Sequence, residues 1–241
     1  MSWHAKARGS YALDTIEAKE NVAMISSDLT SDGWSLKSIA ALLGNGAGES
    51  GLNPWRWESD YVPTYNEFLG WNYSQALSHG YGIFGFTPAY TYINSNNEQS
   101  FSSYGYGPNF SDRAGLATDG EAQVRYFMST VSQNWLHNLY NYYADNFAQI
   151  GVDISTFYYM TFQQFKTATD GNGNSISIAD LTGAFELCYE KPNDAAAASS
   201  YRYRVSQAEA WYEYLQNNPP TPVSSDTFNI MLYLKPRWKK F

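Results

Sequence analysis

Cysteine and histidine are scarce in this chain of 241 residues. Cys188 is its only cysteine, so no disulfide can form within the chain. The three histidines lie far apart, without the HxxxH spacing of a catalytic zinc site: His4, His79 and His137. A GxSxG element and a phosphate-binding loop are also lacking. The sequence therefore predicts no metal and no cofactor, and it disfavours an amidase or endopeptidase mechanism.

Positive charge and long apolar runs are limited as well. Fifteen Lys and Arg residues against 23 Asp and Glu residues give a net charge of −8, and nucleic-acid binding depends on cations that neutralise phosphates. No apolar run is long enough to span a bilayer. The amino-terminal stretch MSWHAKARGSYALDT has no apolar centre followed by a cleavage site. We therefore expect no nucleic-acid partner, no transmembrane segment and no export by an ordinary signal peptide.

Aromatic side chains, by contrast, are abundant. They make up 17% of a chain that is 44% hydrophobic and 16% charged, a composition typical of folded globular proteins. This exceeds what a small core needs, and aromatic faces commonly bind the apolar faces of sugar rings. The composition is thus compatible with a carbohydrate site.

Apolar spacing and capping residues predict a mainly helical, α+β fold. Helices are expected over about 14–29 with an Asp14 cap, from the Ser35 cap towards Glu49, over 118–135 with Thr118 and Glu121 as a capping box, near 162–168, from Ser177 to before Pro192, and from Asp194 to about 218. Between these, residues 51–109 are rich in Gly, Asn, Ser, Pro and aromatics. That segment predicts a long loop insertion with a small hairpin around Tyr81–Phe86, which suits the wall of a binding site.

The most informative motif is GNGAGESGLNPWRW, Gly44–Trp57, in which a lone carboxylate ends an apolar helix. Cleavage of a glycosidic bond needs an acid that protonates the leaving oxygen, and partial burial of a carboxyl group favours its protonated form. Glu49 is the candidate for this acid. A surface glutamate in a glycine-rich loop would produce the same local pattern.

A second motif, HGYGIFGFTPAYTYIN at His79–Asn94, pairs glycines with aromatics. An ordinary hairpin with core aromatics would look the same in isolation. Taken together with the Glu-Ser element, however, the Gly-Tyr-Gly-Ile-Phe element resembles the paired motifs of the lysozyme-like superfamily, which includes goose-type lysozymes and lytic transglycosylases. The resemblance implies that the glutamate ends a helix and that the hairpin faces it across a glycan groove.

Four elements in order are similar to the phage tail lysozyme family over about residues 14–217: DGWSLKSIAALLGN, ESGLNPWRW, GYGIFGFTPAYTYI and AFELCYEKPND followed by a long helix. The resemblance implies a virion-associated enzyme that cleaves peptidoglycan glycan strands during DNA entry, with Glu49 as catalytic residue. It also implies substrate contacts from a set on both motifs: Ser50, Trp57, Tyr81, Gly82, Phe86, Thr87 and Tyr92. Delivery by the particle would explain the missing signal peptide.

Two positions depart from this pattern. The wider superfamily usually has Gln where this chain has Gly85, and tail lysozymes often have Trp at Phe86. Losing the amide removes a hydrogen-bonding group from the groove, so a non-catalytic glycan-binding or structural tail module is the alternative. Glu58 and Asp60 are the candidates for a second carboxylate. The sequence does not separate hydrolysis from lytic transglycosylation, which differ in whether water or the sugar's 6-hydroxyl attacks.

Glutamates near Cys188 have a structural interpretation. Glu186 and Glu190 are expected to pair with Arg202 or Arg204 on the next helix, and Tyr189 is expected to pack in the core, although it could reach the groove.

The sequence Asp170-Gly-Asn-Gly-Asn begins like a calcium-binding EF-hand loop but then departs from that pattern. Ser175 stands where the motif needs glycine, and Leu181 where it needs a bidentate glutamate. We therefore expect an ordinary turn.

The chain is expected to divide into a lysozyme-like domain, residues 1–218, and a proline-containing linker with a cationic tail, residues 219–241. Phe228–Phe241 contains four basic residues and no acidic one: Lys235, Arg237, Lys239 and Lys240. We predict that this tail docks on another phage tail protein. A membrane surface or the chain's own domain are the alternatives.

Overall fold

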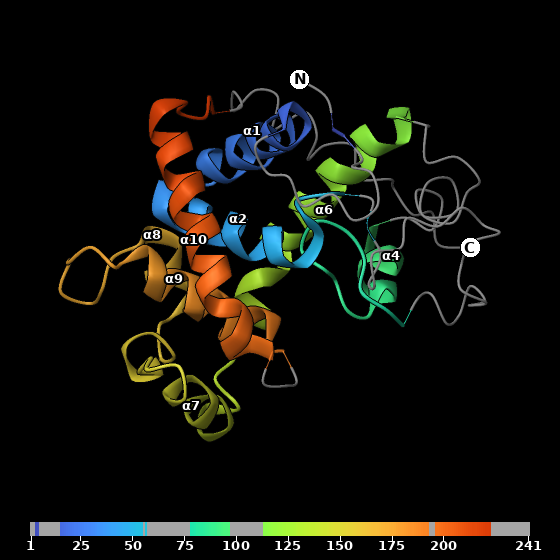
Figure 1. Ribbon diagram of the computed structural model, residues 1–241. Helices are drawn as coiled ribbons and strands as arrows, with labels where there is room; N and C mark the ends of the chain where they lie inside the picture. The colour runs from blue at the N-terminus through green and yellow to red at the C-terminus, as the bar shows by residue number, and fades with distance from the viewer. Residues whose placement is uncertain are drawn as a thin grey trace.

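The computed structural model describes residues 3–4, 15–54, 56, 78–96, 113–192 and 196–222, and over these ranges the protein is mainly helical, as predicted (Figure 1). The elements are α1 (Ile16–Ser31), α2 (Leu36–Ser50), α4 (Ala89–Asn96), α6 (Arg113–Asn134), α7 (Tyr140–Ala148), η3 (Ile154–Thr156), α8 (Phe162–Thr167), α9 (Ile178–Phe185), η4 (Glu186–Glu190) and α10 (Ala196–Asn217). Among the helices described, none combines the length and the apolar character needed to cross a membrane.

Helix α2 is buried and begins where its local sequence predicts. The Ser35 side chain accepts a hydrogen bond from the Ser38 N–H at 3.1 Å, which caps the first turn. Every residue from 38 to 47 is buried. Gly51 ends the helix in the left-handed conformation, with φ 63°. Helix α2 therefore carries Glu49, in its last turn, from the core to the surface.

Helix α10 crosses α2 and packs on it more extensively than any other pair of described elements (Figure 1). The crossing is close at Gly44. A Cβ built there would lie 2.5 Å from the Arg204 carbonyl oxygen and 2.7 Å from Ala208 Cβ. The absence of a side chain at Gly44 lets the helices approach and brings Arg204 to the end of α2.

An aromatic core joins α6, α8 and α9 beneath this pair. The Trp34 ring lies 5.6 Å from Phe127 and 5.8 Å from Phe165, measured between ring centroids. Trp135 packs on Phe165 at 4.9 Å. The ring centroids of Phe127 and Phe185 are 6.0 Å apart, and this contact completes the cluster. Much of the aromatic content that suggested a sugar site is therefore core.

Several boundaries differ from the sequence-based expectation. Helix α6 begins at Arg113, so Thr118 lies inside it and does not cap it. The Thr15 side chain caps α1 by accepting from the Ala18 N–H at 3.2 Å. The helices near 162–168 and after Ser177 are confirmed. Helix α4, which lies in the segment expected to be loop, helix α7 and the 3₁₀ turn η3 were not predicted. The helix expected from Ser177 to before Pro192 is present, but it continues from α9 as the π-helix η4, a change that the apolar spacing does not indicate.

The expected hairpin is reduced to one antiparallel bridge. The Tyr81 and Phe86 backbones exchange hydrogen bonds of 3.1 and 2.9 Å around a tight turn. Most of the predicted loop insertion lies outside the described residues, as do Trp57, Glu58, Asp60 and the tail from residue 223 on. The start of the linker is described, and Ser27 Oγ donates to the Thr221 carbonyl oxygen at 2.5 Å.

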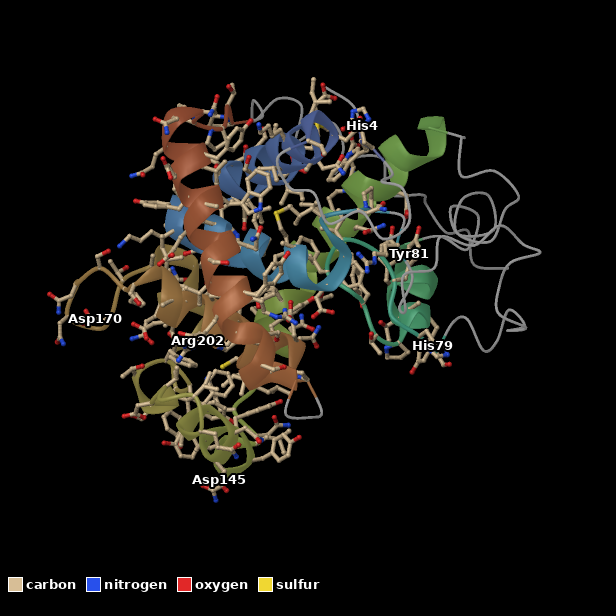
Figure 2. The ribbon with its side chains drawn as sticks, in the orientation of Figure 1. His4, His79, Tyr81, Asp145, Asp170 and Arg202 are labelled. Carbon is tan, nitrogen blue, oxygen red and sulfur yellow. The ribbon has the colours of Figure 1, made fainter. Side chains whose placement is uncertain are left out.

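Asp170 is at the outer end of an exposed loop (Figure 2). Its Oδ1 accepts from the backbone N–H groups of Asn172 and Asn174, each at 2.8 Å. The Asp170 carboxylate therefore accepts hydrogen bonds from the backbone of its own loop, as expected for an ordinary turn. Over the described ranges, no three His, Cys, Asp or Glu side chains are grouped as a metal site.

Candidate active site

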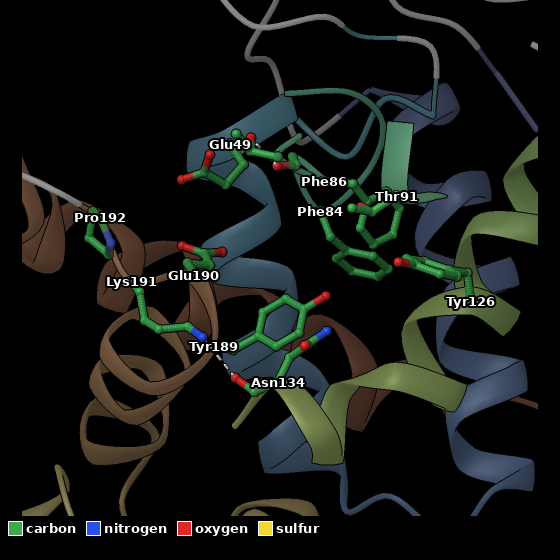
Figure 3. Close-up of a pocket in the computed structure, with 12 residues that line it drawn as sticks. Glu49, Phe84, Phe86, Thr91, Tyr126, Asn134, Tyr189, Glu190, Lys191 and Pro192 are labelled. Atoms are coloured by element: carbon green, nitrogen blue, oxygen red, sulfur yellow. Dashed lines mark hydrogen bonds between the residues drawn. The ribbon is translucent and has the colours of Figure 1, made fainter. Parts of the chain in front are cut away.

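Glu49 lies at the mouth of a pocket of about 370 Å³ (Figure 3). Its side chain is 33% exposed, whereas the helix that carries it is buried. The pocket is lined by residues from α2, the 81–86 turn, α4, α6 and η4: Glu49, Phe84, Gly85, Phe86, Thr87, Thr91, Tyr126, Asn134, Tyr189, Glu190, Lys191 and Pro192. A carboxyl group at such an opening can reach both solvent and a bound ligand.

Arg204, on α10, holds three carboxylates at once. Its Nη2 donates to Glu49 Oε1 at 2.5 Å, and its Nη1 donates to Glu190 Oε2 at 2.5 Å. Its Nε lies 3.1 Å from Glu186 Oε1. Nη1 also donates to Asn45 Oδ1 at 3.1 Å. We call Arg204 with its three glutamates the Arg204 cluster.

Burial dominates the protonation of the two η4 glutamates. It raises the pKa of Glu186 to about 7, and Arg204 and a hydrogen bond from Ser200 oppose the rise. Burial also raises the pKa of Glu190 well above its usual range, against the attraction of Arg204. Burial alone would lower the pKa of Arg204, but the carboxylates, Glu190 foremost, raise it. The guanidinium stays charged while the buried carboxyl groups tend to keep protons.

Aromatic rings form the wall of the pocket across from Glu49 (Figure 3). Phe86 stacks on Tyr92 with ring centroids 5.2 Å apart and meets the edge of Tyr126 at 5.2 Å. Phe84 packs on Phe127 at 4.5 Å, which connects the wall to the core. The wall is therefore built of packed aromatic rings, of which Phe84 and Phe86 are themselves almost fully buried.

Gly85 brings the 81–86 turn against the catalytic candidate. Its φ is 58°, in the left-handed region, and a Cβ built on it would lie 3.1 Å from Glu49 Oε2. The Thr87 hydroxyl donates to the Gly85 carbonyl oxygen at 2.9 Å. The position where the superfamily usually has Gln thus lies directly beside the Glu49 carboxyl group.

Several residues expected to contact substrate are placed in the interior instead. Tyr81 is 1% exposed, and its hydroxyl donates to Asp119 Oδ2 at 2.7 Å. The Tyr92 hydroxyl donates to Asp119 Oδ1. Ser50 donates to the Ile83 carbonyl oxygen at 2.7 Å. Neither Tyr81, Tyr92 nor Ser50 lines the pocket, so their side chains have no surface to offer a ligand there.

Gly82 is also buried and does not line the pocket, because Gln123 packs against it from α6. Gln123 fixes this turn through its Oε1, which accepts from the Ile83 N–H at 2.8 Å, and its Nε2 donates to Asp119 Oδ2 at 2.9 Å. Burial raises the pKa of Asp119, and hydrogen bonds from Tyr92, Tyr81 and Gln123 oppose the rise. This network shapes the pocket wall from behind.

The structure brings Glu49, Phe86 and Thr87 of the expected set together at the pocket. Trp57, Glu58 and Asp60 lie outside the described residues. Arg204 is confirmed as the partner of Glu186 and Glu190, whereas Arg202 donates to the Ile150 carbonyl oxygen at 2.8 Å. Tyr189 and Glu190 line the pocket as well as packing beneath it.

Sequence reasoning missed the link between Arg204 and Glu49, which are 155 residues apart. It also missed Tyr126, Asn134 and Lys191 as pocket residues. The sequence feature that could have indicated the link is the pair Glu186 and Glu190 in a mostly apolar segment, followed by Arg202 and Arg204 on the next helix.

Comparisons with known proteins identify the family of this chain. The model of the family described as phage tail lysozyme matches residues 20–215. Morphogenesis protein 1 of Bacillus phage B103 is 26% identical over 215 residues, which cover 88% of this chain and 44% of that protein. The chain therefore spans less than half the length of this relative. The family match includes every residue that lines the pocket and the whole Arg204 cluster.

Proposed function

This chain belongs to the phage tail lysozyme family, and on that premise we propose that it cleaves the glycan strands of bacterial peptidoglycan with Glu49 as the general acid. The observation that carries the proposal is the placement of Glu49. A buried helix delivers this carboxyl group to the mouth of a pocket whose facing wall is aromatic. Glycosidic cleavage requires an acid that protonates the leaving oxygen, and a carboxyl group at such an opening can supply it.

The two oxygens of Glu49 have different surroundings. Oε1 accepts from Arg204, while Oε2 is the oxygen nearest to Gly85 on the pocket side. In the proposed reaction Oε2 gives its proton to the glycosidic oxygen as the bond to the anomeric carbon breaks, and positive charge develops on that sugar. Water or the sugar's own 6-hydroxyl then attacks the anomeric carbon and passes its proton to solvent, from which Glu49 regains the proton that it gave. Both outcomes share the same first step.

A second carboxylate opposite Glu49 is not part of the proposal. Among the described pocket residues the other carboxylate is Glu190, and it binds the same guanidinium as Glu49. Only 8% of the Glu190 side chain is exposed and one of its oxygens binds Arg204, so we do not assign it the role of the nucleophile or base on the opposite face of the sugar. Glu58 and Asp60 remain candidates for that face.

The test is Glu49→Gln, which keeps the shape of the side chain but cannot donate an acid proton. Purified peptidoglycan is incubated with the parent, with Glu49→Gln and with Glu213→Gln, a control on the exposed face of α10. We expect clearing by the parent and the control and none by Glu49→Gln. Equal clearing by Glu49→Gln would refute the role of Glu49. Mass spectrometry of the products separates transglycosylation, which leaves 1,6-anhydro ends, from hydrolysis.

One observation favours a second candidate, a non-catalytic glycan-binding or structural tail module. Gly85 provides no side-chain amide at the point where the turn meets Glu49. Under this reading the parent pulls down with insoluble peptidoglycan but releases no soluble fragments. The same digestion therefore distinguishes the two candidates.

The phage origin of the family and of the relative supports a proposal about delivery. We propose that the enzyme acts from the virion tail on the host wall during DNA entry, and that residues 224–241 dock on another tail protein. Deleting Ser224–Phe241 should leave clearing by the free protein unchanged and prevent its incorporation into particles. Normal incorporation of the shortened chain would contradict the docking role.

A further inference from the structure

One end of the pocket holds a cation. Lys191 and Asn134 lie at the end away from Glu49, and Lys191 Nζ donates to the Asn134 carbonyl oxygen at 3.0 Å (Figure 3). Among the described residues that line the pocket, Lys191 is the cation; Arg204 is not one of them, and its guanidinium is bound to the three glutamates of the Arg204 cluster. An ammonium group has three donors, so the contact with Asn134 leaves two for a ligand.

We propose that Lys191 is a specificity-determining residue that binds a carboxylate of the glycan strand. Peptidoglycan supplies such groups on its muramic acid units, whose lactyl carboxyl group is either free or joined to a stem peptide that carries carboxylates of its own. Chitin, a polymer of N-acetylglucosamine, has none. The inference rests on the proposed function, because it states which glycan the same pocket selects. Glu49 remains the residue that acts on the glycosidic bond.

The backbone holds Lys191 in a conformation that favours glycine. Its φ is 50° and its ψ 58°, in the left-handed region, where it ends η4 and its N–H donates to the Glu186 carbonyl oxygen at 2.9 Å. Glycine is the usual residue at such a helix end, because a Cβ makes the conformation costly. Strained residues of this kind cluster at functional sites. A lysine kept at this cost points to a use for its side chain.

The surroundings of Lys191 favour an anion. Partial burial lowers the pKa of Lys191, because the ammonium group loses contact with water. A bound carboxylate would replace that solvation with a charge-assisted hydrogen bond. The chain carries a net charge of −8 and repels anions, so a local cation helps an anionic strand to enter the pocket. The pocket's own carboxylates, Glu49 and Glu190, are both bound to Arg204, which offsets their repulsion.

Asn134 adds a second donor at this end of the pocket. Its side chain is exposed and lines the pocket, and an amide NH₂ can bind the second oxygen of a carboxylate. A purely structural role for Lys191 is the alternative. Asn134 is the last residue of α6, and a lysine that donates to a carbonyl oxygen at a helix end stabilises that end. Such a role would affect every ligand equally, whereas carboxylate binding affects only ligands that carry the group.

The experiment measures binding by isothermal titration calorimetry in a Glu49→Gln background, so that no ligand is cleaved. Three soluble oligomers of equal length are compared: a peptidoglycan strand with its stem peptides, the same strand after removal of the peptides, which frees the lactyl carboxylates, and an N-acetylglucosamine oligomer. Each is titrated into protein with Lys191, Lys191→Met or Lys191→Arg. Lys37→Met is the matched control, because Lys37 also donates to a backbone carbonyl oxygen, that of Ile176 at 3.1 Å, but does not line the pocket.

We expect Lys191→Met to raise the Kd of a carboxylate-bearing strand about tenfold, as the loss of one charge-assisted hydrogen bond does, and to leave the Kd of the N-acetylglucosamine oligomer unchanged. Lys191→Arg should retain most of the affinity, and Lys37→Met should alter none of the three values. A loss with the peptide-free strand identifies the lactyl carboxylate as the bound group. A loss confined to the strand with peptides identifies a carboxylate of the stem peptide.

Equal losses for all three oligomers, no loss for any, or a protein that binds none of them would overturn the inference. If Lys191→Met does not fold, Lys191→Gly removes the same charge and suits the left-handed backbone. Binding needs no turnover, so its result is separate from the proposed reaction. A parent protein that binds these strands selectively but clears no peptidoglycan would refute the cleavage and leave the carboxylate site standing.

Discussion

The contact between α2 and α10 gives the sharpest test of how the fold builds the site, through Gly44→Ala. In an exposed helix this change would stabilise by about 1 kcal/mol, because glycine is the poorer helix former. Here the added Cβ would lie 2.5 Å from the Arg204 carbonyl oxygen, 2.7 Å from Ala208 Cβ and 2.8 Å from the Ala208 nitrogen. Two of these atoms belong to the backbone of α10, which can yield only if the helix moves.

Overpacking of this kind costs about 1–3 kcal/mol, and three contacts this short place Gly44→Ala at the upper end. After subtracting the helix-propensity gain, we expect a net loss of about 2 kcal/mol. For a chain of this size that corresponds to a fall in Tm of roughly 4–8 °C. The shift of α10 also moves Arg204 relative to Glu49, so clearing activity should fall in protein that is still folded.

Thermal unfolding followed by circular dichroism measures the loss. Gly171→Ala is the matched control, because a Cβ there meets no atom closer than 3.9 Å. The control should change Tm by less than about 1 °C, since surface substitutions of this kind have small effects. If Gly44→Ala were as stable as the parent, the close crossing would not be what sets α10 on α2.

Three other changes test the electrostatics and the pocket. Burial raises the pKa of Glu186 from 4.5 to about 7. The contribution of this group to the free energy of unfolding, on the order of 3 kcal/mol, is therefore fully present below pH 4.5 and is lost as the pH rises through 7. Glu186→Gln should therefore flatten the fall in Tm between pH 4.5 and 7, and an unchanged slope would contradict the raised pKa. Gly85→Ala adds a side chain at φ 58° next to Glu49 Oε2. We expect the clearing rate to fall at least tenfold, while the free energy of unfolding falls by only about 1 kcal/mol. A loss of stability without loss of clearing would argue against close approach at the acid. Tyr81→Phe removes a hydroxyl from buried Asp119, which should cost about 1–3 kcal/mol in urea unfolding while KM for soluble glycan stays the same; a raised KM with unchanged stability would return Tyr81 to the pocket.

Local hydrogen bonds explain which elements the sequence by itself determined. Ser35 and Ser177 each accept from a backbone N–H three residues on, so the starts of α2 and α9 depend on short segments alone. The end of α2 was equally predictable, because Gly51 follows an apolar helix. Glu49 could therefore be placed at a helix end, and named as the candidate acid, before any packing was known.

Only the tertiary structure decided what surrounds Glu49. Arg204 is 155 residues away, and its contact depends on a helix crossing that Gly44 permits. Tyr81 and Phe86 share one turn, yet the first is held in the core by Asp119 while the second lines the pocket. Aromatic side chains suit both places equally well, so composition cannot assign them. Capping is a property of neighbouring residues, whereas burial and charge pairing arise from elements that meet only when the whole chain has folded.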